Sequence, residues 1–421
     1  MNILIVGGGG REDAIICKLL ENKTIDKIFA LPGVGVKRDK VENIDIGVTD
    51  FIKIIDFCNN HVIDFAIVSL DNPLVLGLVD ELENLNILTF GPSKRAALIE
   101  GSKSFSKDLM KKYDIPTAQY ESFENSKSAI KYLNSCNFPI VIKADGLALG
   151  KGVVICENKK EAEETIVEFI DNKKFSQSSE KIIIEEYLNG YEVSILAFCD
   201  GETIKPLTSS MDHKRIYDND EGPNTGGMGV IAPNPYYTKE VKDFCKEHIF
   251  KKTLDAMNKE NRKFKGCLYF GLMIEKNKAK VIEYNCRFGD PETQAVLPLL
   301  ESDLLSIMIA CSKEELRKYE VKLKDRASCT LVVASGGYPI KYEKDKKITI
   351  NNLKYSIPFF AGVKTENGDL LTNGGRVLSI TSLSDSLETS IKQVYEDVNN
   401  VSFEKMYYRK DIGQKALKKY K

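Results

Sequence analysis

A chain of 421 residues has room for roughly three domains at about 150 residues each, with ample material for buried cores. Its 60 lysines and arginines nearly balance 61 aspartates and glutamates, so the formal net charge is −1. That balance excludes a global field able to hold nucleic acid or an anionic membrane surface. Any bound anion has to be held by a local cluster of charges.

Ten cysteines are scattered from Cys17 to Cys329, and none forms a C-x-x-C pair. Most lie in apolar runs, which favours small buried hydrophobic residues in a reducing compartment over a disulfide or zinc framework. The start, MNILIVGGGG, has no basic segment, and no stretch approaches the roughly 20 apolar residues of a membrane span. We therefore expect a cytoplasmic protein.

The first predicted domain covers residues 1–101. Short apolar runs at 2–6, 27–31, 65–70 and 85–90 alternate with helix-like segments. This alternation predicts a parallel, Rossmann-like sheet with helices on both faces. Ser93, at the end of this unit, is a candidate cap for the next helix.

The second predicted domain covers residues 102–325, with a lid subdomain at about 120–190. Its β-rich segments suggest three strand pairs: 139–144 with 153–156, 181–186 with 193–199, and 268–275 with 280–285. The charged segment 313–326 has a helical pattern and predicts a connector. The third domain, 326–421, is expected to be a small α+β unit with strands at 327–334, 347–350, 354–360 and 376–382 and a helix at 383–398.

Four glycines, Gly7 to Gly10, follow the first apolar run and precede a helical pattern. Backbone N–H groups at such a turn can hold a phosphate. The dinucleotide-binding spacing G-x-G-x-x-G fails in both frames, because the third position falls on Glu12 or Asp13. Arg11 and Glu12 favour a ligand with a phosphate and hydroxyls over nicotinamide, and a bare turn remains the alternative.

A stronger signal is IVIKADGLALGKGVVI at 140–155, in which two β-rich arms flank a loop with Gly146, Gly150, Gly152 and Lys151. Such a hairpin can fold over a triphosphate, donating backbone N–H groups while Lys143 or Lys151 neutralises oxygens. The alternative is a tight hairpin with solvated lysines. No Walker A sequence is present.

Two further segments extend the phosphate site. In IIIEEYLNGYEVSI, residues 182–195, a strand runs into Glu185–Leu188, whose backbone could face an adenine edge, and Glu192 could accept from ribose hydroxyls. In VIEYNCRFGDPETQ, residues 281–294, Glu283 and Asn285 lie two apart and face the same way. Two oxygen donors suit Mg²⁺. Arg287 follows on the same face, where it can contact a transferring phosphoryl group.

The polar segment 211–228 carries the cations His213, Lys214 and Arg215 and ends near Gly226 and Gly227. Long loops of this kind are usually functional or disordered, which favours an active-site loop. His213 is a candidate for substrate positioning or, second, for a catalytic base.

Taken in order, these motifs resemble the ATP-grasp ligases and, within them, the glycinamide ribonucleotide synthetases. The resemblance runs over nearly the whole chain: GGGGRE, GPSKRAALIEGSKSFSKD, IKADGLALGKGV, DHKR with GPNTGGMG, LYFGLM, EYNCRFGDPETQ, ASGGYP, TNGGRVLSI and YRKDIG. The combination of DHKR–GPNTGGMG with RFGDPETQ is specific to this family. It implies ligation of glycine to 5-phosphoribosylamine through glycyl phosphate, with ATP and Mg²⁺ or Mn²⁺ and without a nucleophilic side chain.

The resemblance also implies residue roles. Glu283 and Asn285 would ligate the metal, and Arg287, Asp212 and Lys214 would act in catalysis. The ATP set is Lys103, Lys143, Gly150, Lys151, Gly152, Glu185, Glu186, Tyr187, Leu188 and Glu192. The substrate set is Gly8, Gly9, Gly10, Arg11, Glu12, Asp212, Lys214, Gly226, Arg287, Gly289 and Asp290.

This chain departs from the family pattern at several positions. Asp13 and Phe360 stand where the family usually has histidines, and Leu70-Asp71-Asn72 replaces a Gly-Pro-Glu segment. Asp13 adds negative charge beside the expected phosphate site. Gly271 lies where many ATP-grasp relatives have a third metal-side glutamate, which predicts a metal shell of two residues.

The competing interpretations are another ATP-grasp carboxylate–amine ligase, a carboxylase of similar layout, or a nucleotide-binding regulator or dehydrogenase. No biotin-carrier context supports a carboxylase, and the failed dinucleotide spacing counts against a dehydrogenase. We expect small-molecule substrates only and a monomer or weak homodimer.

Overall fold

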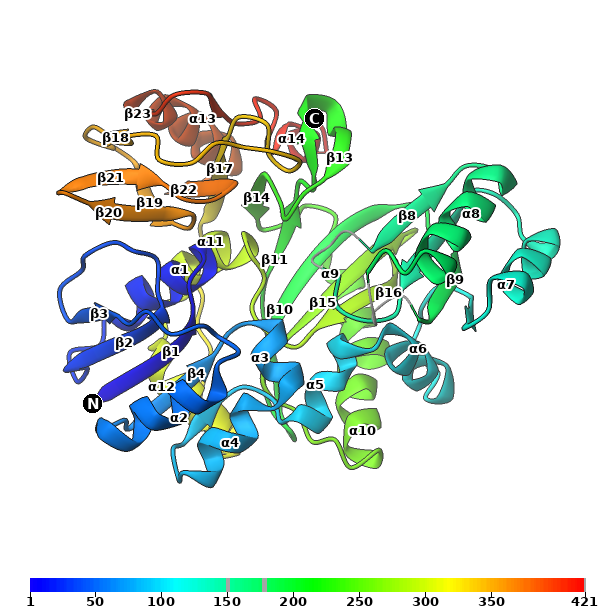
Figure 1. The fold of residues 1–421 in the computed structure, drawn as a ribbon, viewed down its shortest axis with the longest axis horizontal. Coiled ribbons are helices and arrows are strands. Elements are labelled where there is room, and N and C mark those ends of the chain that lie inside the picture. The colour runs from blue at the N-terminus through cyan, green and yellow to red at the C-terminus, as the bar shows by residue number, and fades with distance from the viewer. Residues whose placement is uncertain (149–151, 176–179, 420–421) are drawn as a thin grey trace.

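The computed structural model describes residues 1–148, 152–175 and 180–419. The chain forms an N-terminal, a central and a C-terminal region. The N-terminal region lies beside the C-terminal one, and a lid that belongs to the central region projects to the other side (Figure 1). No helix within these ranges is long and apolar enough to cross a membrane. All ten cysteines are free thiols; eight are buried, and Cys17 and Cys136 are partly buried.

The N-terminal region is built on a parallel sheet of order β3-β2-β1-β4-β5. Alternate residues of β1 enter two different hydrophobic cores, Leu4 and Val6 on one face and Ile3 and Ile5 on the other, so both faces of the sheet are covered. Ser93 caps α5 as predicted, accepting from Ala96 N. The elements are β1 (Asn2–Gly7), α1 (Gly10–Leu19), β2 (Lys27–Pro32), β3 (Val41–Asn43), α2 (Phe51–Asn60), β4 (Phe65–Val68), α3 (Asp71–Leu76), α4 (Leu78–Asn84), β5 (Thr89–Phe90) and α5 (Lys94–Gly101).

The lid is a four-stranded antiparallel sheet of order β6-β9-β7-β8, reached through α6 (Lys103–Lys112). Its helices pack on the sheet around a separate core that includes Ile142, Ile166 and Phe169. The elements are β6 (Tyr120–Phe123), α7 (Ser126–Tyr132), β7 (Ile140–Ala144), β8 (Val153–Cys156), α8 (Lys159–Ile166) and β9 (Ile182–Glu186).

The largest sheet has nine strands, in the order β16-β15-β10-β11-β14-β17-β22-β19, with β24 pairing β17. It joins the central and C-terminal regions, because β14 pairs antiparallel with β17. Its strands are β10 (Tyr191–Asp200), β11 (Ile204–Asp212), β14 (Gly229–Ala232), β15 (Lys265–Glu275), β16 (Lys278–Asn285), β17 (Ala327–Ser335), β19 (Ser356–Phe360), β22 (Arg376–Ser384) and β24 (Met406–Tyr407).

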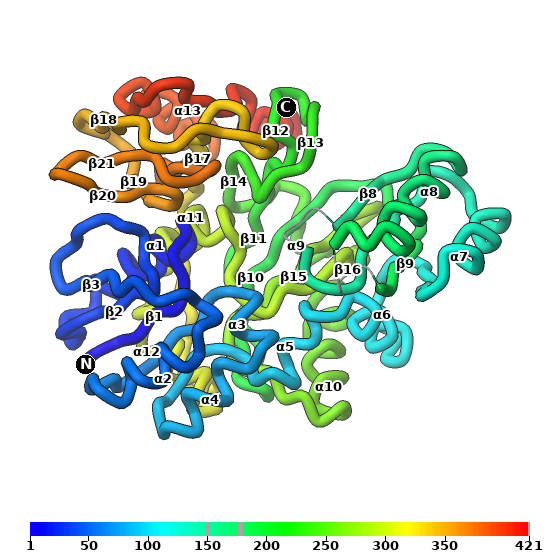
Figure 2. The backbone as a smooth tube through the Cα atoms, in the orientation of Figure 1, coloured from blue at the N-terminus to red at the C-terminus, as the bar shows by residue number. Residues whose placement is uncertain are grey.

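Helices and small ribbons complete these regions. Helix α11 contacts α1 of the N-terminal region, β11 of the central region and β17 of the C-terminal region, so it lies where the three meet (Figure 2). The remaining helices are α9 (Lys239–Cys245), α10 (Lys251–Lys259), α11 (Glu292–Val296), α12 (Leu304–Ser312), α13 (Leu387–Asp397) and α14 (Gln414–Leu417). The two-stranded ribbons are β12 (Arg215–Tyr217) with β13 (Glu221–Asn224), β18 (Thr349–Ile350) with β23 (Val401–Ser402), and β20 (Val363–Glu366) with β21 (Asp369–Thr372).

The predictions for one strand pair and for the connector were wrong. The segment at 181–186 does not pair with 193–199: β9 pairs with β6 and β7, whereas β10 pairs with β11 and β15. The chain changes sheets between β9 and β10, and segment order alone does not reveal such a change. The connector 313–326 is not helical beyond one short 3₁₀ turn, Leu316–Lys318, where its apolar Leu316 is buried.

Candidate active site

The glycine loop turns from β1 into α1 under tight steric limits. A Cβ on Gly8 would lie 2.4 Å from the carbonyl oxygen of Gly33, so no larger side chain fits there. Glu12 is fully buried behind the loop and accepts hydrogen bonds from Gly9 N at 2.7 Å and from Ser69 Oγ at 2.8 Å. Arg11 Nε also donates to Glu12 at 2.6 Å. Arg11 and Glu12 thus brace the loop, and their predicted contact with substrate stays a prediction.

Asp290 connects this loop to the other two regions. It accepts from Arg11 N at 3.3 Å and from Gln294 Nε2 at 3.0 Å, and it pairs with Arg376 Nη2 at 3.2 Å. Burial raises the pKa of Asp290, but the charges of Arg376 and Arg11 outweigh burial and hold the pKa below its usual value. Gly289, just before it, packs against the Glu292 side chain. Three distant parts of the sequence therefore meet at one ionised carboxylate.

Four cations stabilise the negative charge of Glu283 on β16. Burial raises the pKa of Glu283, but Lys214, Lys143, Lys103 and Arg287 together bring it below the usual value. These cations come from separate motifs that the sequence predicted to act together. The arrangement therefore concentrates positive charge around one carboxylate, which suits a polyphosphate with a metal ion.

Each of these cations has a second partner. Lys103 Nζ donates to Gly146 O at 2.8 Å, Lys143 Nζ donates to Ile282 O at 3.2 Å, and Lys214 pairs with Glu192 at 2.9 Å.

Arg287 is tied to both Asn285 and Glu100. It pairs with the buried Glu100 at 3.1 Å, and its Nη2 donates to Asn285 Oδ1 at 3.4 Å. Arg287 is therefore held in place beside the predicted metal ligands.

The predicted adenine segment lies where β9 leaves the lid. Glu185 is buried and pairs with Lys107 and Lys143, each at 3.1 Å. Its other oxygen, Oε1, is buried without a hydrogen-bond donor among the described residues. Glu186 pairs with Lys280 at 2.7 Å. Tyr187 is exposed and Leu188 half-buried, so the backbone from 185 to 188 borders solvent at the lid's base.

Gly152 closes the lid hairpin, because its carbonyl accepts from Ala144 N at 2.8 Å. A Cβ at this glycine would lie 2.7 Å from that of Ala148. Gly150 and Lys151, predicted to bind phosphates, lie outside the described residues.

Asp212 is the last residue of β11 and carries a buried carboxylate. The segment 211–228, which includes Asp212, was predicted to be a long loop, but it contains the β12–β13 ribbon. Asp212 Oδ1 has no hydrogen-bond donor within the described part of the chain, and burial and the nearby Glu292 raise the pKa of Asp212 well above the usual value. Gly227 has a φ of +112°, and a Cβ there would lie 2.6 Å from that oxygen. Asp212 Oδ1 is thus a buried oxygen with no protein donor among the described residues, which leaves it available to a ligand or to water.

His213 does not suit the role of a catalytic base. Its Nδ1 lies 3.1 Å from Gly229 O, and its Nε2 accepts from Gly413 N at 3.1 Å. Burial and the charge of Arg409 lower its pKa to about 4. A neutral ring with both nitrogens bonded to backbone has a structural role.

The departure at Asp13 has a local explanation. Asp13 is fully buried, and Arg38 donates to both its oxygens at 2.9 and 2.6 Å. It also accepts from Phe360 N at 2.7 Å, and the Arg38 guanidinium lies 5.6 Å from the Phe360 ring centroid. The two unusual residues therefore contact each other, and Arg38 neutralises the extra charge.

Lys107, Glu100 and Arg376 were not predicted from the sequence as site residues. Lys107 is four residues after Lys103 on α6, a spacing that places both on one helix face and could have revealed it. Burial lowers its pKa to about 8, and it donates to Thr117 Oγ1 at 2.8 Å. Glu100 and Arg376 carry no such signal, because their partners are distant in sequence.

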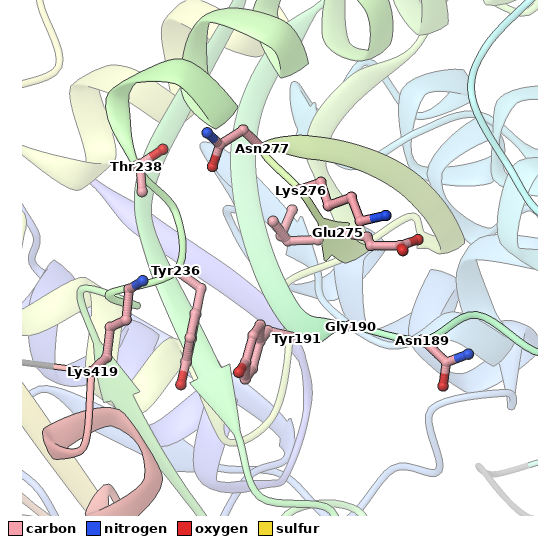
Figure 3. A pocket seen from close by; sticks show the side chains of 10 residues that line it. Asn189, Gly190, Tyr191, Tyr236, Thr238, Glu275, Lys276, Asn277 and Lys419 are labelled. Atoms are coloured by element: carbon pink, nitrogen blue, oxygen red, sulfur yellow. The ribbon is translucent and has the colours of Figure 1, made fainter.

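One cavity of about 330 Å³ is separate from this cluster (Figure 3). The stacked rings of Tyr191 and Tyr236, with centroids 3.5 Å apart, line it together with the turn Glu275–Asn277. Successive residues of a strand face opposite ways, so Tyr191 faces away from Glu192, which pairs with Lys214. The cavity therefore lies behind the sheet that carries the cluster.

Fold and site together define the class. A lid sheet carrying Lys143 closes against a larger sheet carrying Glu283, and residues 101–293 match the ATP-grasp (A) domain model of phosphoribosylglycinamide synthetase. The chain is an ATP-grasp ligase, and this fold is one that binds ATP. Residues 1–100 match the N domain model and residues 328–415 the C domain model of the same family. The chain belongs to the phosphoribosylglycinamide synthetase family.

Individual relatives agree with this assignment. The chain is 46% identical over 420 residues to phosphoribosylamine–glycine ligase of Fusobacterium nucleatum, covering 98% of each protein. The phosphoribosylamine–glycine ligase structure from Thermotoga maritima matches with a TM-score of 0.87 at 32% identity, over 98% of this chain and 100% of that one. The biotin carboxylase domain of 2-oxoglutarate carboxylase from Hydrogenobacter thermophilus, solved with MgADP, matches over 96% of this chain and 91% of that one, with a TM-score of 0.73. At 14% identity it shares the fold alone.

Proposed function

We propose that this chain uses ATP to join glycine to the amine of 5-phosphoribosylamine, giving glycinamide ribonucleotide, ADP and phosphate, as a step of purine biosynthesis. The observation that carries the proposal is the convergence of four cations on Glu283, beside a glycine loop that Asp290 ties to the same centre. The cations near Glu283 suit a nucleoside triphosphate, and the glycine loop with Asp290 suits a small phosphorylated amine. The family match supports both.

The chemistry explains why such a centre is needed. A carboxylate is a poor acylating agent, because oxide would have to leave. Transfer of the γ-phosphoryl group to glycine gives glycyl phosphate, from which phosphate leaves when the amine attacks carbon. Catalysis of this kind rests on positioning and charge neutralisation, which Arg287, Lys143 and Lys214 would supply.

The residues present fit a divalent cation. Glu283 and Asn285 are one carboxylate and one amide oxygen on the same face of β16, a donor set typical of Mg²⁺ or Mn²⁺ with phosphate oxygens in the shell. Gly271 pairs with Glu283 across the sheet, so the neighbouring position has no side chain to add. A bound Mg²⁺ would neutralise charge on the ATP phosphates.

The other roles follow from position. Lys103 and Lys143 would contact ATP phosphates, residues 185 to 188 would border the adenine, and Glu192, held by Lys214, would meet the ribose of ATP. The lid hairpin would exclude water from the acyl phosphate.

For the second substrate, Gly8–Gly10, Gly226, Gly289 and Asp290 would surround the sugar. Asp212 would accept a hydrogen bond from an amine. Its unpartnered oxygen supports this assignment.

A direct test is ADP release from Mg-ATP with phosphoribosylamine generated in situ, leaving out one component at a time. Release that requires both glycine and the amine is expected. Release with another acid or amine would keep an ATP-dependent ligase and move the substrate assignment. ATP binding without release under any combination would contradict the proposal.

A further inference from the structure

The glycine loop does not by itself offer a free anion site. At the start of α1, Gly9 N donates to Glu12 Oε2 and Arg11 N donates to Asp290 Oδ2. These two amides already hold carboxylates of the protein. A sugar phosphate that binds here therefore needs a hydrogen-bond donor other than these two amides.

Two of the nearby arginines are committed elsewhere. Arg11 has a side chain only 6% exposed, and it donates to Glu12 and to Phe288 O. Arg38 binds Asp13 through two parallel hydrogen bonds. Neither presents a free planar edge to the loop.

Arg376, at the start of β22, is placed differently. Its side chain is 21% exposed, and its Nη1 donates to Gly226 O at 2.7 Å and to Asp290 O at 2.9 Å. Its Nε has no acceptor among the described residues. A Cβ on Gly226 would lie 2.9 Å from Arg376 Cζ, so this glycine permits the close approach.

The charges support the same residue. Arg11 offsets Glu12, and Arg376 offsets Asp290. Without Arg376, this side of the loop would carry a net negative charge and repel a phosphate. With it, a partly exposed guanidinium faces the predicted substrate residues, and such a group binds phosphate through paired hydrogen bonds.

We propose that Arg376 binds the phosphate group of the sugar substrate and makes the enzyme select a phosphorylated amine. This inference rests on the proposed function. Arg376 thereby makes the C-terminal region a part of the substrate site, with Asp290 left to face the sugar hydroxyls. The competing interpretation is a purely structural tie between Asp290 and Gly226.

The two interpretations predict different values of one ratio, kcat/KM for phosphoribosylamine divided by kcat/KM for ribosylamine. Both amines are generated in situ from ammonia and the corresponding sugar. Arg376→Met is expected to lower the first value about 10- to 100-fold and to leave the second within about twofold, because a charge-assisted contact to phosphate is lost. Arg376→Lys keeps the positive charge but loses the paired donors of the guanidinium. Its ratio should therefore lie between those of the wild type and Arg376→Met. Arg326→Met, another arginine of the C-terminal region that bonds Leu383 O, is the matched control and should leave the ratio unchanged.

An unchanged ratio in Arg376→Met, with both substrates impaired alike, would overturn the inference and leave a structural tie. Melting temperature and ATP affinity are measured first, and if the methionine variant does not fold, the ratio in Arg376→Lys decides. Failure of the wild-type enzyme to release ADP with either amine would contradict the proposed function itself. If the wild-type enzyme is active and the ratio in Arg376→Met is unchanged, only the inference about Arg376 fails.

Discussion

Individual side chains at this site serve more than one partner. Arg287 is the clearest example, because it pairs with the buried Glu100, lies beside Asn285 and helps to lower the pKa of Glu283. Burial opposes the charge of Arg287, but Glu100 and Asp71 keep its pKa above the ordinary value. Its guanidinium is thus a fixed charge at the point where phosphoryl transfer is proposed.

Replacing Arg287 with alanine should lower kcat about 100- to 1,000-fold, because a preorganised donor to the transferring group is lost. The Kd for ATP should change far less. The removal also leaves Glu100 buried without its partner, at a cost to stability of about 3 kcal/mol. The double variant Arg287→Ala/Glu100→Gln should recover stability but not kcat in steady-state and melting measurements. Turnover equal to wild type in either variant would exclude the role.

Glu283 is the one carboxylate of the predicted metal pair. Glu283→Gln keeps the shape of the side chain but removes its charge, so the Mg²⁺ concentration for half-maximal activity should rise about tenfold or more. The titration is repeated with Glu275→Gln, an exposed carboxylate at the far end of the neighbouring strand, as the control. An unchanged Mg²⁺ requirement would remove Glu283 from the metal shell.

Single residues show what sequence could and could not predict. Glu283, Lys143 and Arg287 were predicted from local motifs, and Lys103 and Lys214 from the family resemblance; all four cations stabilise the charge of Glu283. Arg376 and Glu100 could not be predicted, because their partners lie 86 and 187 residues away. His213 looked functional because its neighbours in the sequence are charged, but its ring bonds only to backbone groups.

At the scale of elements, the hairpin of β12 and β13 is fastened to the last part of the chain. Arg409 is completely buried and binds Asp411 and Asp220, and His213 accepts from Gly413 N. These contacts hold both flanks of Lys214. Alternation and β-branched residues predicted where the strands lie. They did not predict which sheet each strand joins, because the chain changes sheets between β9 and β10.

His213 predicts a pH effect on stability. Its pKa is about 4 in the folded protein against 6.5 for the free side chain. Folding therefore favours the neutral ring, and the free energy of unfolding falls as pH drops from about 6.5 toward 4, by up to about 3 kcal/mol for this group. Above pH 6.5 the contribution is fully present.

The comparison that isolates this effect is urea unfolding of wild type and His213→Gln between about pH 7.5 and pH 4.5, where histidine titrates. The difference in stability between the two proteins should shrink as pH falls. A constant difference would show that protonation of His213 is not resisted by the fold.

At the scale of the whole molecule, hydrogen bonds join the N-terminal and C-terminal regions beside a buried ion pair of the N-terminal region. Asp13 on α1 binds Arg38 and accepts from Phe360 N on β19, and Thr365 Oγ1 donates to Gly35 O at 2.8 Å. The parallel N-terminal sheet and the ATP-grasp regions were predicted from patterning and family motifs. The continuity of the main sheet through β14 and β17 was not, because it depends on strand partners far apart in sequence.

Asp13→Asn should lower the midpoint of thermal unfolding by several degrees, since breaking a buried ion pair costs about 3 kcal/mol. Glu42→Gln, which removes an exposed ion pair with Lys27, is the matched control and should shift it by about a degree or less. Equal shifts in the two variants would show that the buried contacts of Asp13 contribute no more to stability than an exposed ion pair.

The most direct measurement follows oxygen atoms through the reaction. Glycine labelled with ¹⁸O in its carboxylate is turned over with Mg-ATP and phosphoribosylamine, and the released phosphate is examined by ³¹P NMR for the isotope shift. Transfer through glycyl phosphate predicts one labelled oxygen in each phosphate, because the oxygen that bridged carbon and phosphorus leaves with phosphorus. Phosphate without label, or ADP formed at the same rate without glycine, would contradict the proposed chemistry.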